Sequence, residues 1–507
     1  MIRNTLTIAL LMVQSAFAGS GHVWNPDCGE EEYRFGYLFP RLTSLDVPDG
    51  VLKEIGKPSN DSNLPAYLED SQFRGTDNNS ETVVGQTYIG QILAHDISVD
   101  RYSVLGQSNN AWELPNDATP WLDLDTLYEF DGIQAPRETF DRAKLLLGNY
   151  LGNERDFPRT LSGHAILADR RNDENNNVAQ LSGVLMRLHN VFVDQLRSEG
   201  VPSDELFDKA RQWVEWHWQS IVLTEFLPNV LDAEVLDDVM QNGRRHYRNY
   251  YSKRGIVPVE FSAAASRFGH SMVRGRYTLN EDFDRVRVFP LSEAELGRNL
   301  LGNQAIAPER QIEWNRFFRI AGSASGDTDD DVDQFAGLQV ARKIDRLLAR
   351  PMLRLPVGGP GLPDFILDPE NTIAGMPTVS LGALSLFRGK ALGLPSGQDV
   401  AAAMGYEPLD ISVFNFCGLG EDCGPDGINL AEPPEEAPLF LYVVQEAREQ
   451  NEGERLGNVG SRIVAEVVIG LLEGDRSSIA HVDFQSTITG TGLVSMADVI
   501  EFIGWAE

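Results

Sequence analysis

Apolar residues recur at steps of three and four along this chain, and that spacing constrains its fold more than any other feature. The clearest stripe lies between Val178 and Leu196 and consists of Leu181, Val184, Leu185, Leu188, Val191, Phe192 and Leu196. Such a stripe covers one face of an α-helix that packs against a core. The same periodicity predicts helices over 87–97, 207–227, 263–273 and 457–472. The helix over 207–227 is expected to end at Pro228, because proline breaks the helical hydrogen-bond ladder.

Strand patterns are few and short, so the sequence predicts a mainly α fold. The proline-rich stretches 355–363 and 432–438 predict loops, and the acidic run 327–333 predicts a solvated loop. No internal repeat is visible, and 42% of the residues are hydrophobic, as expected of a folded globular protein. We therefore expect one large helical domain with few short strands over residues 19–507.

The first eighteen residues have the pattern of a secretory signal peptide. Arg3 supplies a positive charge, residues 6–13 are apolar, and Ala16 and Ala18 are small residues at a cleavage-site spacing. The sequence therefore predicts a secreted protein with a signal peptide over residues 1–18. No later segment has about 18 consecutive apolar residues, so no membrane span is expected.

Charge and cysteine content narrow the partners and the redox chemistry. The chain has 43 basic and 75 acidic residues, a net charge of −32, which argues against nucleic acid and anionic membranes as partners. Cys417 and Cys423 flank a glycine-rich loop and could pair, which would leave Cys28 as the odd thiol. Three cysteines do not make a disulfide scaffold. The oligomeric state stays open.

Two segments carry polar residues that could do chemistry. In the first, Gly90 to Asp96, His95 and Asp96 end a short amphipathic helix. Taken alone, this histidine fits a packed core imidazole better than a catalytic group. In the second, a tight loop offers oxygen donors at alternate positions, as a hard cation of the Ca²⁺ type requires: the side chains of Thr119, Asp123 and Asp125 and the carbonyl of Trp121. Asp96 would complete that ligand set.

Two further segments complete the pattern. One is Arg171-Asn172-Asp173-Glu174, followed by Arg187 and His189; the other is Arg267-Phe268-Gly269-His270. In order and spacing, the four segments together resemble the animal-type haem peroxidases of the peroxidase–cyclooxygenase superfamily. The resemblance extends from Gln86 to about Arg388, and residues 456–466 resemble bacterial members.

The resemblance implies a role for each matching residue. On the distal side of a haem b it implies a histidine, an arginine and a glutamine, at His95, Arg171 and Gln91. On the proximal side it implies His270 as the iron ligand and Arg267 as an arginine near it. It further implies a haem-ester glutamate at Glu174, a haem-propionate arginine at Arg388, and a Ca²⁺ site made by Asp96, Thr119, Trp121, Asp123 and Asp125.

The resemblance also implies an enzyme and a mechanism. A secreted haem peroxidase would use hydrogen peroxide, through a ferryl intermediate, to oxidise a small-molecule electron donor such as iodide, bromide, thiocyanate or a phenol. Peroxide cleavage requires a group that moves a proton between the two oxygens, which a neutral His95 can do. Arg171 supplies positive charge where the departing oxygen becomes negative. His270 holds the iron and sets its redox behaviour.

Three positions depart from the family pattern. Ala94 stands where mammalian members have an aspartate that forms a second haem ester, and Asn175 stands where one has a methionine bonded to a haem vinyl. At most one covalent link, through Glu174, is therefore expected, and with it a milder oxidant than a chlorinating enzyme. Ser385 replaces an asparagine that accepts a hydrogen bond from the proximal imidazole, and a hydroxyl accepts it more weakly.

Two alternatives stay open. One is a haem-dependent fatty-acid dioxygenase, although Arg267 occupies the position of the tyrosine that such enzymes of the cyclooxygenase branch place before the proximal histidine. The other is a non-catalytic extracellular adhesion or matrix protein built on a peroxidase fold, because a fold does not determine a function.

Overall fold

The computed structural model describes residues 33–56, 78–320, 337–356, 362–373, 375–419, 421 and 427–506. Helices dominate these residues and the sheets are small, which confirms the predicted mainly α class. The helices are α3 (Asp49–Gly56), α4 (Gly85–Ile97), α5 (Asp125–Tyr128), α6 (Asn176–Ser198), α7 (Leu206–Ile221), α8 (Leu227–Val230), α9 (Ala233–Asn242), α10 (Asn249–Ser252), α11 (Val259–Ser262), α12 (Gly269–Met272), α13 (Leu381–Ala391), α14 (Gly397–Met404), α15 (Leu439–Asn451), α16 (Asn458–Gly474) and α17 (Met496–Phe502).

The strands are short and pair in sheets of two or three. They are β1 (Phe35–Gly36), β2 (Asn79–Val83), β3 (Glu129–Phe130), β4 (Ile133–Gln134), β5 (Val257–Pro258), β6 (Arg276–Tyr277), β7 (Val286–Arg287), β8 (Val340–Arg342), β9 (Leu355–Pro356), β10 (Asp368–Ile373), β11 (Met376–Val379), β12 (Phe416–Gly418) and β13 (Ile428–Leu430). β1 and β5 pair in parallel, as do β12 and β13. The other pairs are antiparallel: β2 with β8, β3 with β4, β6 with β7, and β11 with both β10 and β9.

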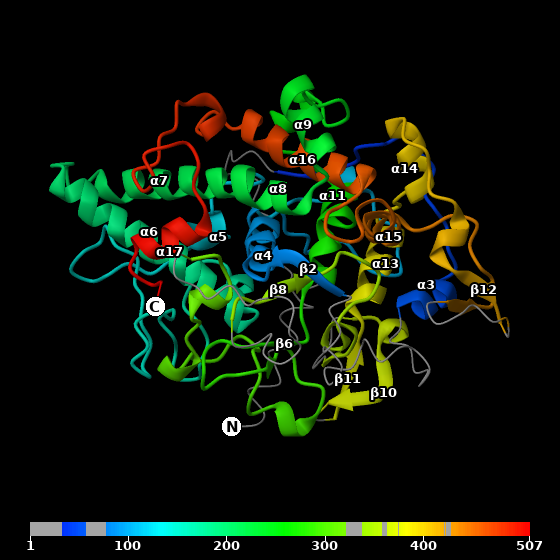
Figure 1. The fold of residues 1–507 in the computed structure, drawn as a ribbon, viewed down its shortest axis with the longest axis horizontal. Coiled ribbons are helices and arrows are strands. Elements are labelled where there is room, and N and C mark those ends of the chain that lie inside the picture. Colours follow the sequence, from blue (N-terminus) through cyan, green and yellow to red (C-terminus); the bar gives the residue numbers. More distant parts are fainter. Residues whose placement is uncertain are drawn as a thin grey trace.

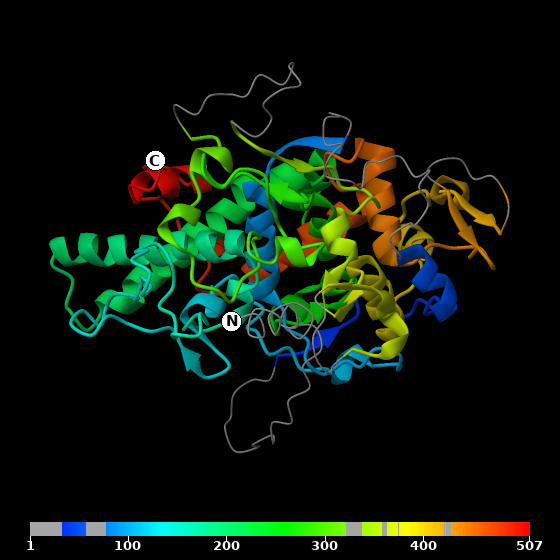
Figure 2. The ribbon, with the colours of Figure 1, turned by 90° about the horizontal axis from the view of Figure 1, so that it is seen from below.

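α4 lies in the middle of the molecule, between the α6–α7 pair and the group formed by α13 and α15 (Figure 1). The same central helix is visible in the perpendicular view (Figure 2). It packs against α6, α12 and the β2–β8 pair, so it contacts segments far apart in the sequence. Its apolar residues Ile89, Ile92 and Ile97 are fully buried in a continuous apolar cluster that also includes side chains of α6, α7 and α16. The chain thus holds the segment with His95 rigidly in its core.

Three predicted helices are confirmed within two residues at each end: 87–97 is α4, 178–196 is α6 and 457–472 is α16. The predicted end at Pro228 is wrong. After α7, a π-helical turn over Val222–Phe226 leads into α8, where Pro228 lies in the first turn. An amide hydrogen is not needed in a first turn, so the proline is accommodated and the helical path continues to Val230.

The predicted helix over 263–273 is also wrong, because the segment is broken. The backbone of Ala264 (φ −130°, ψ −74°) interrupts it, a 3₁₀ turn follows over Ala265–Phe268, and α12 comes next. The Nε of Arg267 donates to the carbonyl of Ser262 at 2.8 Å. A side chain thereby takes the carbonyl oxygen that a continuous helix would use for its own ladder, which favours the break.

Some predictions fall outside the described residues: the signal peptide over 1–18, the acidic loop 327–333, Cys28 and Cys423. Cys417 is disulfide-bonded, and Cys423, with which it could pair, lies outside the described residues. The described part of the loop 432–438 has no helix or strand, as predicted. None of the described helices combines the length and the apolar character needed to cross a bilayer.

Candidate active site

A cavity beside α4 is lined by predicted site residues that lie far apart in the sequence, from Gln91 to Arg388. Its wall includes the predicted residues Gln91, His95, Arg171, Glu174, Arg267, His270 and Arg388. The rest of the wall is largely apolar, with Phe226, Phe268, Met272, Val288 and Leu384 among its members. The centres of water-sized molecules can occupy about 230 Å³ of it, far more than the ~10–15 Å³ that one water needs.

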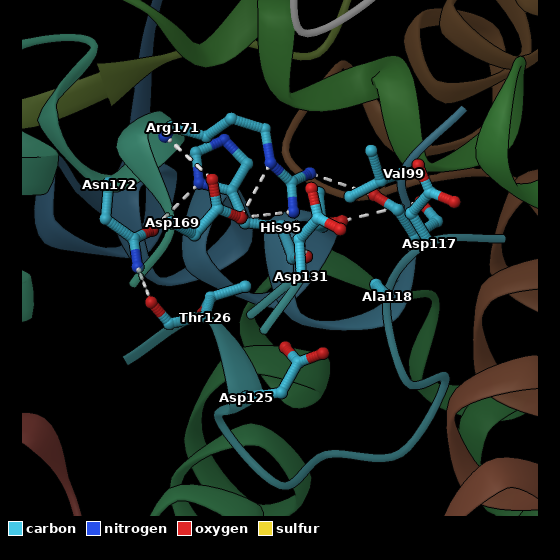
Figure 3. A network of polar contacts seen from close by, with 12 residues as sticks. His95, Val99, Asp117, Ala118, Asp125, Thr126, Asp131, Asp169, Arg171 and Asn172 are labelled. Atoms are coloured by element: carbon cyan, nitrogen blue, oxygen red, sulfur yellow. Dashed lines mark hydrogen bonds and ion pairs between the residues drawn. The ribbon is translucent and has the colours of Figure 1, made fainter. Parts of the chain in front are cut away.

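His95 is held in one tautomer by Asn172. The Nδ2 of Asn172 donates to the carbonyl of Thr126 at 3.3 Å, so the Oδ1 of Asn172, 3.0 Å from His95 Nδ1, acts as the acceptor (Figure 3). His95 Nδ1 therefore carries the proton and Nε2 keeps its lone pair. Burial, followed by the charge of Arg171, lowers the pKa of His95 to about 4. The ring is thus a neutral base near pH 7, as predicted.

Arg171 comes from the 3₁₀ turn Arg170–Asp173 and folds back over the end of α4. Its Nε and Nη2 bind one oxygen of Asp169 at 2.8 and 2.6 Å. Nη1 donates to the carbonyl of Ser98 at 2.9 Å, and Nη2 also donates to the carbonyl of His95 at 2.7 Å. Figure 3 shows the guanidinium between Asp169 and the backbone of His95. Its orientation is therefore fixed by four hydrogen bonds.

Glu174 and Gln91 lie beside the free nitrogen of His95. Glu174 Oε2 is 3.8 Å from His95 Nε2 and accepts a hydrogen bond of 3.4 Å from Gln91 Nε2. Asn175, which caps α6 by accepting from the amide of Val178, donates to Gln91 Oε1 at 3.1 Å. The two residues after the 3₁₀ turn thus fix the helical glutamine in place.

His270, in the short helix α12, also reaches the cavity wall. Burial, followed by the charge of Arg267, lowers the pKa of His270 to about 3. Its Nδ1 is buried and has no hydrogen-bond partner among the described residues. The Ser385 hydroxyl, which was expected to accept a hydrogen bond from this nitrogen, does not do so. It donates to the carbonyl of Leu381, one turn earlier in its own helix, at 2.9 Å.

Arg267 and Arg388 add positive charge to the same wall. Burial, followed by repulsion from Arg388, lowers the pKa of Arg267 to about 10. Arg388 binds Asp100 and donates to the hydroxyl of Ser103 at 2.5 Å. In this structure a side-chain carboxylate, Asp100, is thus the partner of the arginine for which a haem propionate was expected.

The predicted cation ligands form a separate cluster below α4. Carboxylate oxygens of Asp96, Asp123 and Asp125 lie within 4.8 Å of one another. Thr119 joins them, because its hydroxyl donates to Asp123 at 2.7 Å and its amide donates to Asp125 at 2.9 Å. Trp121 lies in the same loop, with its ring nitrogen donating to Tyr33 at 3.1 Å.

Two features of this cluster fit a bound cation. Oδ1 of Asp96 and Oδ1 of Asp125 are buried without a hydrogen-bond partner among the described residues. Burial and the neighbouring carboxylates raise the pKa of Asp96 and of Asp125 well above the usual range. A divalent ion would satisfy the buried oxygens and neutralise the repulsion.

The cavity also fits a haem. Two imidazoles reach it from different helices, its walls are mostly apolar, and arginines offer charge for carboxylates. Beside His270, a Cβ added to Gly269 would meet no atom within 4 Å, so the space there is open. These are the requirements of a flat, largely apolar ligand with an iron to coordinate and propionates to neutralise.

His189 and His217 have structural roles, as predicted. His189 is held by the hydroxyl of Tyr128 at 3.2 Å and the carbonyl of Ala143 at 2.9 Å. His217 contacts the carbonyl of Trp213 at 2.6 Å and the hydroxyl of Ser486 at 2.9 Å. Neither ring lines the cavity.

Sequence reasoning missed three polar residues of the site: Asn172, Asp169 and Asp100. Asn172 was visible as part of the Arg171 segment but was given no role. A weak signal existed for Asp169, which caps the 3₁₀ turn by accepting from the amide of Arg171 at 2.9 Å, since aspartate is a common capping residue. Asp100 and Arg388 are 288 positions apart in the sequence, and no local sequence pattern predicts that they pair.

Comparisons with known proteins find relatives of this chain in sequence and in structure. Residues 97–313 match the family model of the animal haem peroxidases. The chain is 25% identical over 426 residues to Dual oxidase 2 of Rattus norvegicus, which covers 78% of this chain and 25% of that protein. It is 22% identical over 314 residues to Chorion peroxidase of Drosophila melanogaster, which covers 61% of this chain and 34% of that protein. The chain thus spans about a third or less of the length of these relatives.

Solved structures show the same fold. Peroxidase A from Dictyostelium discoideum superposes with a TM-score of 0.62 at 15% identity, covering 97% of this chain and 98% of that one. A fatty acid alpha-dioxygenase from Arabidopsis thaliana superposes with a TM-score of 0.53 at 15% identity, covering 84% of this chain and 71% of that one. At these identities the likeness concerns the fold alone.

Proposed function

We propose, from the match of residues 97–313 to the family model of the animal haem peroxidases, that this chain is a secreted haem peroxidase that uses hydrogen peroxide to oxidise small anions or phenols. The observation that carries the proposal is a neutral His95 beside Arg171, in a cavity that also holds His270. Secretion rests on the signal-like residues 1–18.

His95 is the proton carrier in this proposal. Its Nε2 lone pair accepts the proton from one oxygen of the peroxide and returns it to the other oxygen, which leaves. His270 would hold a haem, which would supply the iron chemistry of peroxide cleavage. The Nδ1–H bond to Asn172 keeps the ring in the orientation that presents Nε2.

Arg171 stabilises the negative charge that develops on the departing oxygen. A guanidinium has five N–H groups, and within the described residues four of those of Arg171 are bonded to Asp169, Ser98 and His95. One Nη1–H remains for the reaction. Because the other four bonds fix the group beforehand, little reorganisation is needed when charge develops.

Glu174 is the candidate for a covalent haem link. Its carboxylate lines the cavity beside His95 and Gln91, and neither Ala94 nor Asn175 can form the other links of mammalian members. With at most one link, the haem is less tuned toward strong oxidation, so iodide, bromide, thiocyanate and phenols are the proposed donors rather than chloride.

Acidified organic extraction tests the ester. Part of the haem should stay with the wild-type polypeptide, and Glu174→Gln should release all of it. Complete extraction from the wild type would refute the link and would leave the peroxidase proposal standing.

We assign the acidic cluster below α4 to Ca²⁺. The support is the ligand chemistry of Asp96, Asp123 and Asp125, whose oxygens converge, together with the side chain of Thr119 and the carbonyl of Trp121. The ion would join the loop 119–125 to the helix that carries His95.

The function is tested with the full chain purified with haem. A Soret band should appear, and peroxide should drive oxidation of iodide, bromide, thiocyanate or a phenol, with most of this activity lost in His95→Ala. No haem uptake, or full activity in the variant, would overturn the proposal. Oxygen uptake with linoleate in the absence of peroxide would instead point to a dioxygenase.

A further inference from the structure

Tyr102 is a half-exposed tyrosine close to the cavity, and no role described above uses it. Its side chain is 49% exposed. Asp100, two residues earlier, lines the cavity, and two residues of extended chain span at most about 7 Å. The backbone amide of Tyr102 donates to Asp100 Oδ1 at 3.0 Å. The backbone of Tyr102 is therefore fixed to a residue of the cavity wall.

The anchor of Tyr102 is part of the wall itself. Asp100 accepts from the hydroxyl of Ser103 at 2.6 Å and is ion-paired with Arg388, which lines the cavity. Tyr102 is thus connected to a cavity arginine through one carboxylate. This connection fixes the backbone of Tyr102 relative to the residues that line the cavity.

The Tyr102 hydroxyl has a proton acceptor in place. It donates to Asp117 Oδ1 at 3.0 Å. Asp117 is held in turn by Arg101, whose Nε is 3.4 Å from its other oxygen, and Arg101 also binds Asp131 at 2.7 Å. A phenol loses an electron far more readily when its proton can leave at the same time, and this geometry provides the path.

We propose that Tyr102 is a second oxidation site, at which phenolic donors too large to enter the cavity are oxidised at the protein surface. This proposal rests on the peroxidase function proposed above, with hydrogen peroxide as the oxidant. Tyr102 gives one electron to the peroxide-oxidised haem, and its phenolic proton passes to Asp117. The resulting phenoxyl radical takes a hydrogen atom from the donor, which restores Tyr102 and leaves a donor radical. Asp117 then releases its proton to solvent, and the reduction of peroxide takes up an equal number of protons. Two such events convert one hydrogen peroxide and two donor molecules into two waters and two donor radicals.

The exposed surface around Tyr102 suits an aromatic donor. Val104, two residues after Tyr102, is 46% exposed, so this loop also presents an apolar side chain to solvent. Tyr150 offers a matched control: its side chain is 50% exposed, and its hydroxyl has no hydrogen bond with any described residue. The two tyrosines therefore differ in the proton acceptor and in their connection to the cavity, but not in exposure.

The test compares haem-loaded wild type, Tyr102→Phe and Tyr150→Phe with two donors, iodide and a phenol-grafted dextran. In Tyr102→Phe, kcat/KM for the dextran should fall about tenfold or more, while kcat/KM for iodide stays within about twofold. Tyr150→Phe should match the wild type with both donors. Retained iodide oxidation also shows that each variant is folded.

A second readout does not depend on turnover. Peroxide is added without a donor in the presence of a nitroso spin trap, and the adduct is located by peptide mass spectrometry. The adduct should fall on the Tyr102 peptide in the wild type and in Tyr150→Phe, and should be absent from that peptide in Tyr102→Phe. An adduct confined to other residues, or dextran oxidation unchanged in Tyr102→Phe, would overturn this proposal while iodide oxidation upholds the peroxidase. Loss of iodide oxidation in the wild type would refute both.

Discussion

The orientation of the His95 ring depends on Asn172, a residue to which the sequence analysis gave no role. Asn172 fixes the tautomer because its own amide nitrogen is engaged by the carbonyl of Thr126. Without that acceptor, the buried Nδ1–H would lose its partner and the ring could rotate or change tautomer. Asn172 therefore helps to set the orientation of the His95 ring.

Replacing Asn172 tests this dependence. Asn172→Ala should lower the rate constant for reaction with peroxide about 10–100-fold, in the range typical of residues that orient a functional histidine. The haem should remain bound, which its Soret band reports. Asn172→Asp, which keeps an acceptor oxygen, should recover most of the rate. A wild-type rate in Asn172→Ala would contradict the orienting role.

The pH dependence follows from the same residue. Burial and the charge of Arg171 lower the pKa of His95 to about 4. A lowered pKa keeps the neutral, proton-accepting form at pH values where an ordinary histidine is charged. The rate constant for peroxide should therefore stay level as the pH falls through the ordinary histidine value of about 6.5, and decline only as the pH approaches 4. Stopped-flow measurements across this range check it, and a midpoint near the ordinary value would count against the buried environment.

At this scale the sequence was informative about the residues that belong to spaced motifs. His95, Arg171, Glu174 and His270 stand in segments that form a recognisable pattern only together, through their order and spacing, and the structure gathers them in one cavity. The residues that pair with them were harder to foresee. Asp100 and Arg388 are far apart in the sequence and form an ion pair only in the folded chain. The hydroxyl of Ser385 is short and donates to a backbone carbonyl of its own helix, which sequence reasoning did not foresee.

Among the elements, α4 connects the cavity to the acidic cluster. Gln91 and His95, one turn apart, line the cavity, while the next residue, Asp96, points to Asp123 and Asp125. A cation bound there would tie the end of the helix to the loop 119–125. The position of the catalytic base would then depend on the ion.

Removing Ca²⁺ tests this connection. Lowering free Ca²⁺ from about 100 times its Kd to zero should cost about 2.7 kcal/mol of unfolding free energy. A chelator should accordingly lower the thermal midpoint and the peroxide activity. Asp125→Asn should mimic the chelator, whereas Asp194→Asn, at a half-exposed carboxylate of α6 outside the cluster, should not. Indifference to the chelator at raised temperature would argue against a structural cation.

Helices with a long apolar stripe were predictable from the sequence. Helices whose ends or breaks depend on a local hydrogen bond were not. α6 and α16 bury their stripes as the spacing indicates. The helical path crosses Pro228 because a π-helical turn precedes it, and 263–273 is broken where Arg267 takes the carbonyl of Ser262. In each case a single hydrogen-bonding detail outweighed the periodic pattern.

At the scale of the whole molecule, the fold gathers segments from residue 91 to residue 388 around one cavity. That convergence could not be read from helix periodicity, which says nothing about which helices meet. The ordered motifs indicated it only through their resemblance to a known family. The central claim is that this cavity binds haem through His270 and activates peroxide through His95.

The most direct test is the bimolecular rate constant for hydrogen peroxide, measured by stopped flow on haem-loaded wild type and His95→Gln. Loss of the proton carrier should lower this rate constant about 10²–10⁴-fold, while the Soret band shows that haem is still bound. An unchanged rate constant in His95→Gln, with haem bound, would contradict the account.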